Sequence, residues 1–167
     1  LIDGAVVHRD SLGTEQLIRP GDVNLMTAGQ GIAHSERSDT ASRARGSGLF
    51  GIQCWLALPA AIEERPPNFA HLDAEALPRI ERKGIRIRVV TGSFMGLRSP
   101  VPTASDQVFA DIDMDEGAAL SIPSQHEERA LYALTGGIAV GNTPYDSGRL
   151  LILSPGRRVT VRATAHT

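Results

Sequence analysis

The stretch IRPGDVNLMTAGQGIAHSE, residues 18–36, places a turn on either side of one short apolar run. Pro20-Gly21-Asp22 predicts the first turn, because proline presets φ and glycine accepts positive φ. Val23 to Thr27 then predicts a strand. Gly29-Gln30-Gly31 lets the backbone turn sharply again, so a further strand is expected to carry the last residues of the stretch.

His34 and Glu36 close this stretch and are separated by Ser35 alone. Side chains at i and i+2 of a strand project to the same face, so the imidazole and the carboxylate are expected to point together. One nitrogen and one oxygen donor suit non-haem iron, manganese, nickel or copper. The same triplet arises easily by chance, and two ligands do not make a catalytic metal site. The residues alone leave a metal site and a solvated polar pair open, with the polar pair the simpler interpretation.

An all-β fold is predicted from the way glycine and proline separate short apolar runs. Among 167 residues, 17 glycines and 10 prolines interrupt short apolar runs, and few windows show the helical period. A hydrophobic content of 41% is enough for a globular core. Residues 37–48 are expected to be a polar surface loop, and residues 73–76 a short helical turn. Strands are expected at 5–7 and 16–18 around a turn at 10–13, at 23–27, at 50–58 with at least one buried face, at 85–90 with one exposed face, and at 108–114, 129–134, 138–140, 150–153 and 159–162.

Two similar β units are predicted from a weak internal repeat. LIDGAVV at 1–7 parallels ALTGGIA at 133–139, and LIRPGDVNLMTA at 17–28 parallels LILSPGRRVTVRA at 151–163. The second copy has an upstream half, whereas the first begins at what should be its middle. The expected domains are residues 1–58 and 85–167, joined by a proline-rich connecting segment at 59–84.

Charge and cysteine content exclude several classes of function. Lys and Arg number 17 against 19 acidic residues, a net charge of −2, so no basic field is available for direct nucleic acid binding. Cys54 is the only cysteine, which excludes an internal disulfide and favours a reducing compartment, so a cytoplasmic location is expected. No apolar run approaches the roughly 20 residues that span a bilayer, so no membrane contact is expected.

The other motifs that could indicate a functional site are weaker. Residues 46–51 satisfy G-x-G-x-x-G, but a polar loop precedes them and a strand is expected to follow, the opposite of a dinucleotide site. Ser35 faces away from His34 and Glu36, which excludes a hydrolase triad. The remaining histidines are expected to be solvated or without a ligand role: His8, His71, His126 and His166.

Six segments together resemble the pirin family of bicupin proteins. They are LIDGAVVHRDSLG, IRPGDVNLMTAGQGIAHSE, FGIQCWLALP, PPNFAHL, RVVTGSFMGLRSPV and HEERALYALTGG, and they run across nearly the whole chain. The resemblance implies two cupin barrels of the double-stranded β-helix (jelly-roll) type, with one metal held in the first by three histidines and a glutamate. The expected fold is an all-β bicupin whose first barrel is incomplete in this chain.

By this resemblance His34 and Glu36 are the second pair of metal ligands. The implied cofactor is one divalent transition metal, iron first, with manganese, nickel, copper and cobalt as alternatives. The first pair belongs to a histidine-x-histidine motif upstream of Leu1, so the opening strands are expected to be missing, and metal binding is expected to be weak or absent. In the second cupin Ile122 and Ser124 stand where that motif has its histidines and Glu128 where it has its glutamate, so residues 85–167 are expected to be metal-free.

The resemblance implies two kinds of activity. The first is a quercetin 2,3-dioxygenase, which opens a flavonol with O2; the metal would acidify the substrate hydroxyl and Glu36 would accept its proton. Four apolar side chains are expected to form a dry interior or plain core: Leu25, Met26, Ile52 and Trp55. The alternative is a metal- or redox-responsive regulator that binds a transcription factor or a metabolic enzyme.

Overall fold

The computed structural model describes residues 1–46 and 48–167, which form two compact units of mostly β structure. Unit 1 comprises Leu1–Pro78 and Val90–Val108, and unit 2 comprises Arg79–Val89 and Phe109–Thr167. The predicted all-β class is therefore confirmed. Within the described ranges no helix is long and apolar enough to cross a membrane.

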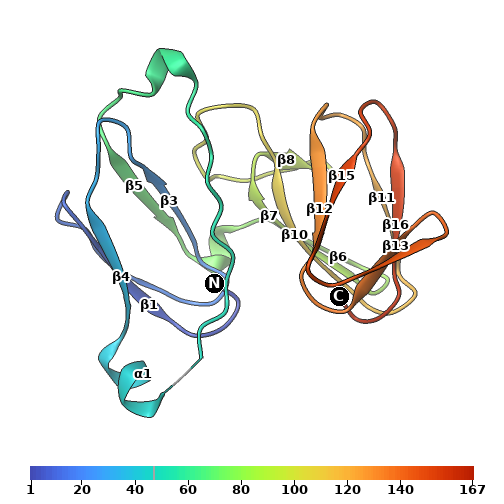
Figure 1. Ribbon diagram of the computed structural model, residues 1–167, viewed down its shortest axis with the longest axis horizontal. Helices are drawn as coiled ribbons and strands as arrows, with labels where there is room; N and C mark the ends of the chain where they lie inside the picture. Colours follow the sequence, from blue (N-terminus) through green and yellow to red (C-terminus); the bar gives the residue numbers. More distant parts are fainter. Residues whose placement is uncertain (47) are drawn as a thin grey trace. The chain divides into compact units, whose positions relative to one another are not determined.

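Unit 1 is built from two main sheets (Figure 1). The first has the order β2-β1-β4, with β1 at Val6–Asp10, β2 at Glu15–Ile18 and β4 at His34–Ser38. The second pairs β3 at Val23–Thr27 with β5 at Asn68–Leu72. The smaller elements of this unit are α1 at Thr40–Arg45, the 3₁₀ turns η1 at Ala60–Ile62 and η2 at Ala74–Ala76, and the short strands β8 at Ser93–Phe94 and β9 at Leu97–Arg98.

The predicted hairpin at the start of the chain is confirmed and shows why β1 has two different faces. Val6 pairs with Ile18 across the β1–β2 ladder, and both are buried, with 5% and 4% of their surface exposed. Because successive side chains alternate between faces, His8 and Asp10 lie on the same side as Val6. The inward face of β1 therefore changes from apolar to polar along its length.

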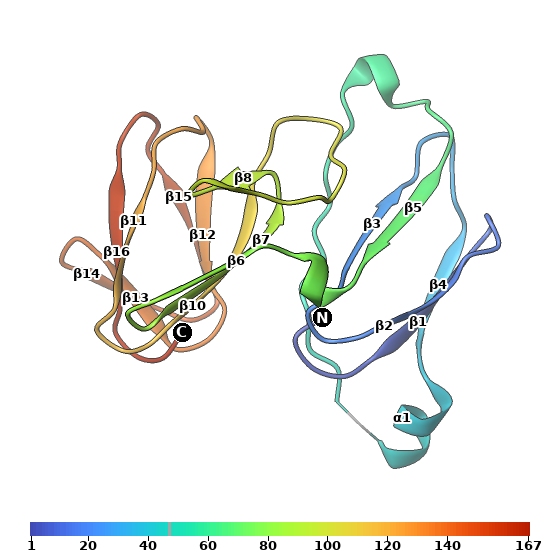
Figure 2. The ribbon, with the colours of Figure 1, turned by 180° about the vertical axis from the view of Figure 1, so that it is seen from behind.

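Unit 2 contains three sheets (Figure 2). The strand orders are β10-β7-β6, β11-β16-β13-β14 and β12-β15. Its core includes Ile87 at 2% and Val89 at 0% exposure, on the alternating strand predicted at 85–90. The strand bounds are β6 Arg79–Arg82, β7 Ile85–Thr91, β10 Phe109–Met114, β11 Ala119–Ile122, β12 Arg129–Ala133, β13 Gly137–Val140, β14 Thr143–Asp146, β15 Arg149–Leu153 and β16 Val159–Ala163.

Two local predictions are wrong. The strand expected at 50–58 is not formed: Phe50 makes one isolated bridge with Asp3, and residues 51–58 have no ladder. A strand is stable only when its backbone groups bond to a neighbouring strand, and no described strand pairs with this segment. The loop expected at 37–48 contains α1, because the Asp39 side chain accepts hydrogen bonds from the backbone N–H groups of Ala41 and Ser42 and caps the helix.

The predicted domains 1–58 and 85–167, joined by a segment at 59–84, stay a prediction, and the structure shows how the joining segment pairs. The segment at 59–84 includes β5, whose five residues pair with β3 from Val23↔Leu72 to Thr27↔Asn68. This pairing makes it part of unit 1 as far as Pro78. Backbone hydrogen bonds between residues distant in sequence decide the units, and a proline-rich composition does not reveal them.

Candidate metal centre

Strand β4 presents His34 and Glu36 on one face of the three-stranded sheet. The β1–β4 register places His34 opposite Asp10 and Glu36 opposite His8. Residues directly opposite in an antiparallel pair share a face, so four polar side chains gather on the side of the sheet that also carries Val6. His34 and Glu36 are both exposed.

His8 is buried, and its predicted solvation is wrong. Only 1% of the residue is exposed. Its ring stacks on Phe69 of β5 with a centroid separation of 4.3 Å and an interplanar angle of 15°, and it lies nearly parallel to His34 at 5.6 Å and 23°. The ring of Phe69 brings the β3–β5 sheet against the β1–β4 sheet, which covers His8 and leaves β4 open.

The two nitrogens of His8 have different surroundings. Nε2 lies 3.1 Å from Oδ2 of Asp10, whose side chain is fully buried. Nδ1 lies 3.7 Å from Oε1 of Glu36, beyond hydrogen-bonding distance, and has no hydrogen-bond partner among the described residues. His8 therefore holds a buried polar atom directed toward one of the predicted ligands.

The carboxyl of Asp10 is held in its ionised form. Burial acts to raise its pKa, but hydrogen bonds, the strongest from the backbone N–H of Thr14, outweigh burial and place the pKa below its ordinary value. Its Oδ1 accepts from the N–H groups of Leu12 and Thr14, at 2.9 and 3.0 Å. The turn of the hairpin thus fixes the carboxylate that faces His8.

A second group of possible ligands lies at β5. Asp22, His71 and Asp73 place one ligand atom each within 4.8 Å of one another, which the group on β1 and β4 does not do in the described structure. His71 was expected to be solvated but is half-buried, with Nδ1 2.7 Å from Asn24 Oδ1 and Nε2 3.3 Å from Asp73 Oδ1. Asp22 accepts from the N–H groups of Arg19 and Ala74. These hydrogen bonds join β3 to the turn after β5, which is a structural role.

Two of the four apolar side chains expected in the interior are on the surface. Ile52 is 46% and Trp55 92% exposed, because the strand predicted to bury them is not formed. Leu25 and Met26 are half-buried on β3, opposite Ala70 and Phe69. A dry cavity for an aromatic molecule is therefore not lined by Ile52 or Trp55 in this structure.

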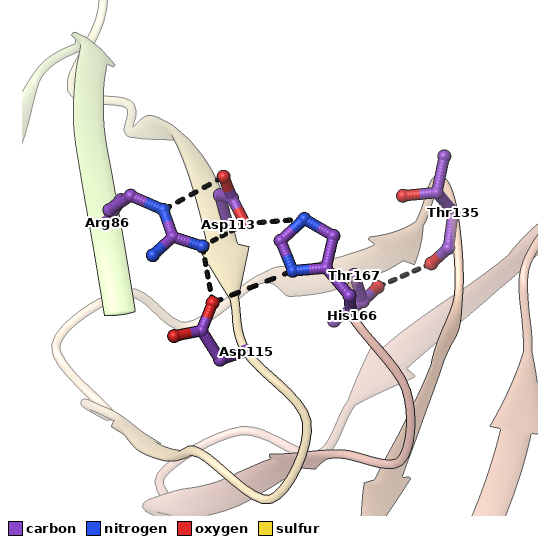
Figure 3. A network of polar contacts seen from close by, with 6 residues as sticks. All are labelled: Arg86, Asp113, Asp115, Thr135, His166 and Thr167. Atoms are coloured by element: carbon purple, nitrogen blue, oxygen red, sulfur yellow. Dashed lines mark hydrogen bonds and ion pairs between the residues drawn. The ribbon is translucent and has the colours of Figure 1, made fainter. Parts of the chain in front are cut away.

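Unit 2 contains a charged network at its surface (Figure 3). Arg86 bonds to both oxygens of Asp113 and to Asp115, and His166 lies 3.5 and 3.6 Å from these two carboxylates. Hydrogen bonds from Arg86 hold the pKa of both carboxyls below the ordinary value and raise the pKa of Arg86. His166 is exposed, as predicted, but it is paired with carboxylates.

In unit 2, the positions that correspond to the family's first ligand motif do not form a group of metal-binding side chains. Ile122 is a core residue with 7% exposure, at the end of β11. Ser124 and Glu128 are exposed, and His126 is half-buried in the same loop. The metal-free character of this unit remains a prediction.

Comparisons with known proteins agree with this architecture. The Pirin family model matches residues 1–56. A pirin-like protein of Caulobacter vibrioides is 35% identical over 164 residues, which are 98% of this chain and 57% of that protein. The crystal structure of a quercetin 2,3-dioxygenase from Acinetobacter baumannii is 28% identical, with a TM-score of 0.88 over 98% of this chain and 58% of that one. A bacterial pirin from Escherichia coli in complex with nickel(II) has a TM-score of 0.68 at 15% identity, over 99% of this chain and 66% of that one, which shows the fold alone.

The fold defines an all-β protein of the cupin class. The first 56 residues of the chain match the Pirin family model and nearly its whole length is similar to a pirin-like protein, in agreement with the resemblance that its motifs predicted. It spans about half the length of the curated relatives it matches.

Sequence reasoning missed His8 and Asp10. The alternation of Val6, His8 and Asp10 on one strand was a usable signal, because a buried Val6 puts the other two inward. The approach of His8 to Glu36 depends on the β1–β4 register, which joins these two residues across 28 positions of the chain.

Proposed function

We propose that the protein is a pirin-like, metal-dependent dioxygenase that opens a flavonol such as quercetin with O2. The observation that carries this proposal is the pair His34 and Glu36 on one face of β4, beside the buried Nδ1 of His8, which has no hydrogen-bond partner among the described residues. A mixed set of imidazole and carboxylate donors suits a divalent transition metal, with iron first and manganese, nickel, copper or cobalt as alternatives. The relatives named for quercetin 2,3-dioxygenase activity support the choice of substrate.

His34 would hold the metal as a neutral nitrogen donor. Glu36 would bind through one carboxylate oxygen and accept the proton of the substrate's 3-hydroxyl group. A bound divalent metal supplies Lewis acidity, which lowers the pKa of a coordinated hydroxyl group. Because both residues are exposed on β4, a flat aromatic substrate can approach them from the open side of the sheet.

The test is turnover of quercetin by the purified protein loaded separately with each of the five metals. Loss of quercetin absorbance and O2 uptake are followed together, because a dioxygenase consumes both in equal amounts. His34→Ala is expected to abolish turnover. His166→Ala removes an exposed histidine from unit 2 and is expected to leave turnover unchanged. If none of the five metals supports turnover above the rate of the His34→Ala variant, the dioxygenase proposal is excluded.

A metal- or redox-responsive binding protein is the alternative, and one feature favours it. The segment at 49–56 exposes large apolar side chains, among them Leu49 at 56%, Leu56 at 55% and Trp55 at 92%. Exposed apolar surface of this kind is typical of protein contact sites. If turnover fails, a pull-down with wild-type protein and a Trp55→Ser, Leu56→Ser double variant tests whether this segment binds a transcription factor or a metabolic enzyme.

A further inference from the structure

We propose that Asp22, His71 and Asp73 bind a divalent transition-metal ion, with zinc(II) as the probe. Asp22 directly precedes β3, His71 lies on β5 and Asp73 follows the end of β5. The group shares no residue with the pair His34 and Glu36, so this inference does not rest on the proposed function.

The tautomer of His71 follows from its neighbour on β3. Nδ1 lies 2.7 Å from Oδ1 of Asn24, the residue opposite His71 in the β3–β5 ladder. An amide oxygen can only accept a hydrogen bond, so Nδ1 carries the proton and donates to it. In the neutral ring the lone pair is then on Nε2, which lies 3.3 Å from Oδ1 of Asp73.

The contact between Nε2 of His71 and Asp73 needs a cation. A carboxylate oxygen is also an acceptor, so in the neutral ring two lone pairs face one another. Either a proton on Nε2 or a metal ion between the two atoms makes the contact favourable. A proton serves this one contact, whereas a metal ion binds several donors at once. Asp22 adds a second carboxylate, with the ligand atoms of all three residues within 4.8 Å of one another, and this convergence favours the metal ion.

The spacing fits one ion. Two ligand atoms each about 2.1 Å from zinc are separated by about 3.4 Å at a tetrahedral angle. The separation of 3.3 Å between Nε2 of His71 and Oδ1 of Asp73 is close to that value. The side chain of His71 is 16% exposed and therefore held in place, whereas that of Asp73 is 76% exposed and can rotate to complete the site.

Hydrogen bonds from outside the group hold two of the ligands. Oδ2 of Asp22 accepts from the N–H of Arg19 at 2.8 Å, and Oδ1 accepts from the N–H of Ala74 at 3.2 Å. An ionised carboxylate has about four acceptor positions, so lone pairs remain for a metal. Asn24 fixes the second nitrogen of His71, as carbonyl groups do for histidine ligands of known metal sites. A bound ion would tie the start of β3 to the turn after β5 and stabilise the folded chain.

The test measures zinc binding by calorimetry and thermal melting in a His34→Ala, Glu36→Gln double variant. This variant lacks the ligands of the proposed dioxygenase metal, so loss of turnover leaves the result standing. It is expected to bind one zinc ion and to melt at a higher temperature with zinc than without it. Adding His71→Gln is expected to weaken zinc binding at least tenfold and to abolish the rise in melting temperature. Adding Asp73→Asn is expected to weaken binding in the same way, and its exposed position keeps the fold unchanged.

His166→Gln in the same double variant is the matched control. His166 also lies beside two carboxylates, those of Asp113 and Asp115, but in unit 2, and its removal is expected to leave zinc affinity unchanged. Circular dichroism and melting without zinc confirm that each variant is folded. Absence of zinc binding in the double variant would overturn the proposal, because a proton on His71 would then account for the contact. Unchanged affinity in the His71→Gln and Asp73→Asn variants, or its loss in His166→Gln, would also overturn it.

Discussion

Gly29 is predicted to be the position at which a single methyl group most disturbs the approach to β4. Its φ is +53°, and a Cβ built there would lie 1.9 Å from the backbone carbonyl oxygen of Arg65. The same oxygen accepts a hydrogen bond from the N–H of Gln30 at 3.0 Å. Gly29→Ala must therefore strain the backbone, push two chain segments apart and weaken this hydrogen bond.

Gly46 is a matched control for the strain alone. It has a left-handed conformation, with φ 68° and ψ 41°, and nothing lies within 4 Å of a Cβ built there. An alanine in the left-handed region costs roughly 1–2 kcal/mol. Gly29→Ala bears a similar cost plus about 1 kcal/mol or more for the lost hydrogen bond and the displaced carbonyl, roughly 3 kcal/mol in all.

Thermal melting followed by circular dichroism compares the two variants. About 1 kcal/mol shifts the melting temperature of a chain this size by roughly 2–4 °C, so Gly46→Ala is expected to lower it by about 3–6 °C and Gly29→Ala by about 6–12 °C. Because Gly29 precedes the strand of His34 and Glu36, metal affinity is expected to fall in Gly29→Ala only. Equal shifts in the two variants would refute the contact with Arg65 as a rigid constraint.

Two further predictions concern other parts of the chain. Trp55, the single tryptophan, is 92% exposed, so its fluorescence should resemble that of free tryptophan and change little on unfolding in urea; emission at a shorter wavelength would mean that another chain or segment covers it. The pKa of Asp113 is lowered in the folded protein by Arg86, so its contribution to stability is present above the ordinary carboxyl pKa, about 4, and is lost as the pH falls through the folded value. Asp113→Asn should therefore flatten the decline of melting temperature between pH 5 and pH 2, and an unchanged slope would contradict this role.

Most of the strands could be predicted from residue types because their patterns are local. The first hairpin, β3 and β7 follow from turn residues and alternation, and β15, a Pro-Gly turn and β16 repeat the order of β2, a Pro-Gly turn and β3. The segment at 50–58 has the same apolar character but forms no strand. Its failure shows that composition predicts the tendency to pair, whereas a partner decides whether pairing occurs.

Some residues of the candidate site could likewise be predicted from the sequence, and others could not. His34 and Glu36 could be found from their spacing and the family motif, and their common face follows from strand geometry. His8 and Asp10 could not, because their relation to Glu36 requires the β1–β4 register and the ring of Phe69 from a distant strand.

The sequence by itself therefore determined the all-β class and the pirin resemblance, and it predicted one half of the candidate site, since each depends on residues close together in the chain. Only the tertiary structure decided which histidine is buried, which of its nitrogens has no hydrogen-bond partner among the described residues, and which segments join each compact unit. The physical reason is that burial and hydrogen bonding are properties of neighbours in space, and β-sheets bring together neighbours that lie far apart in sequence.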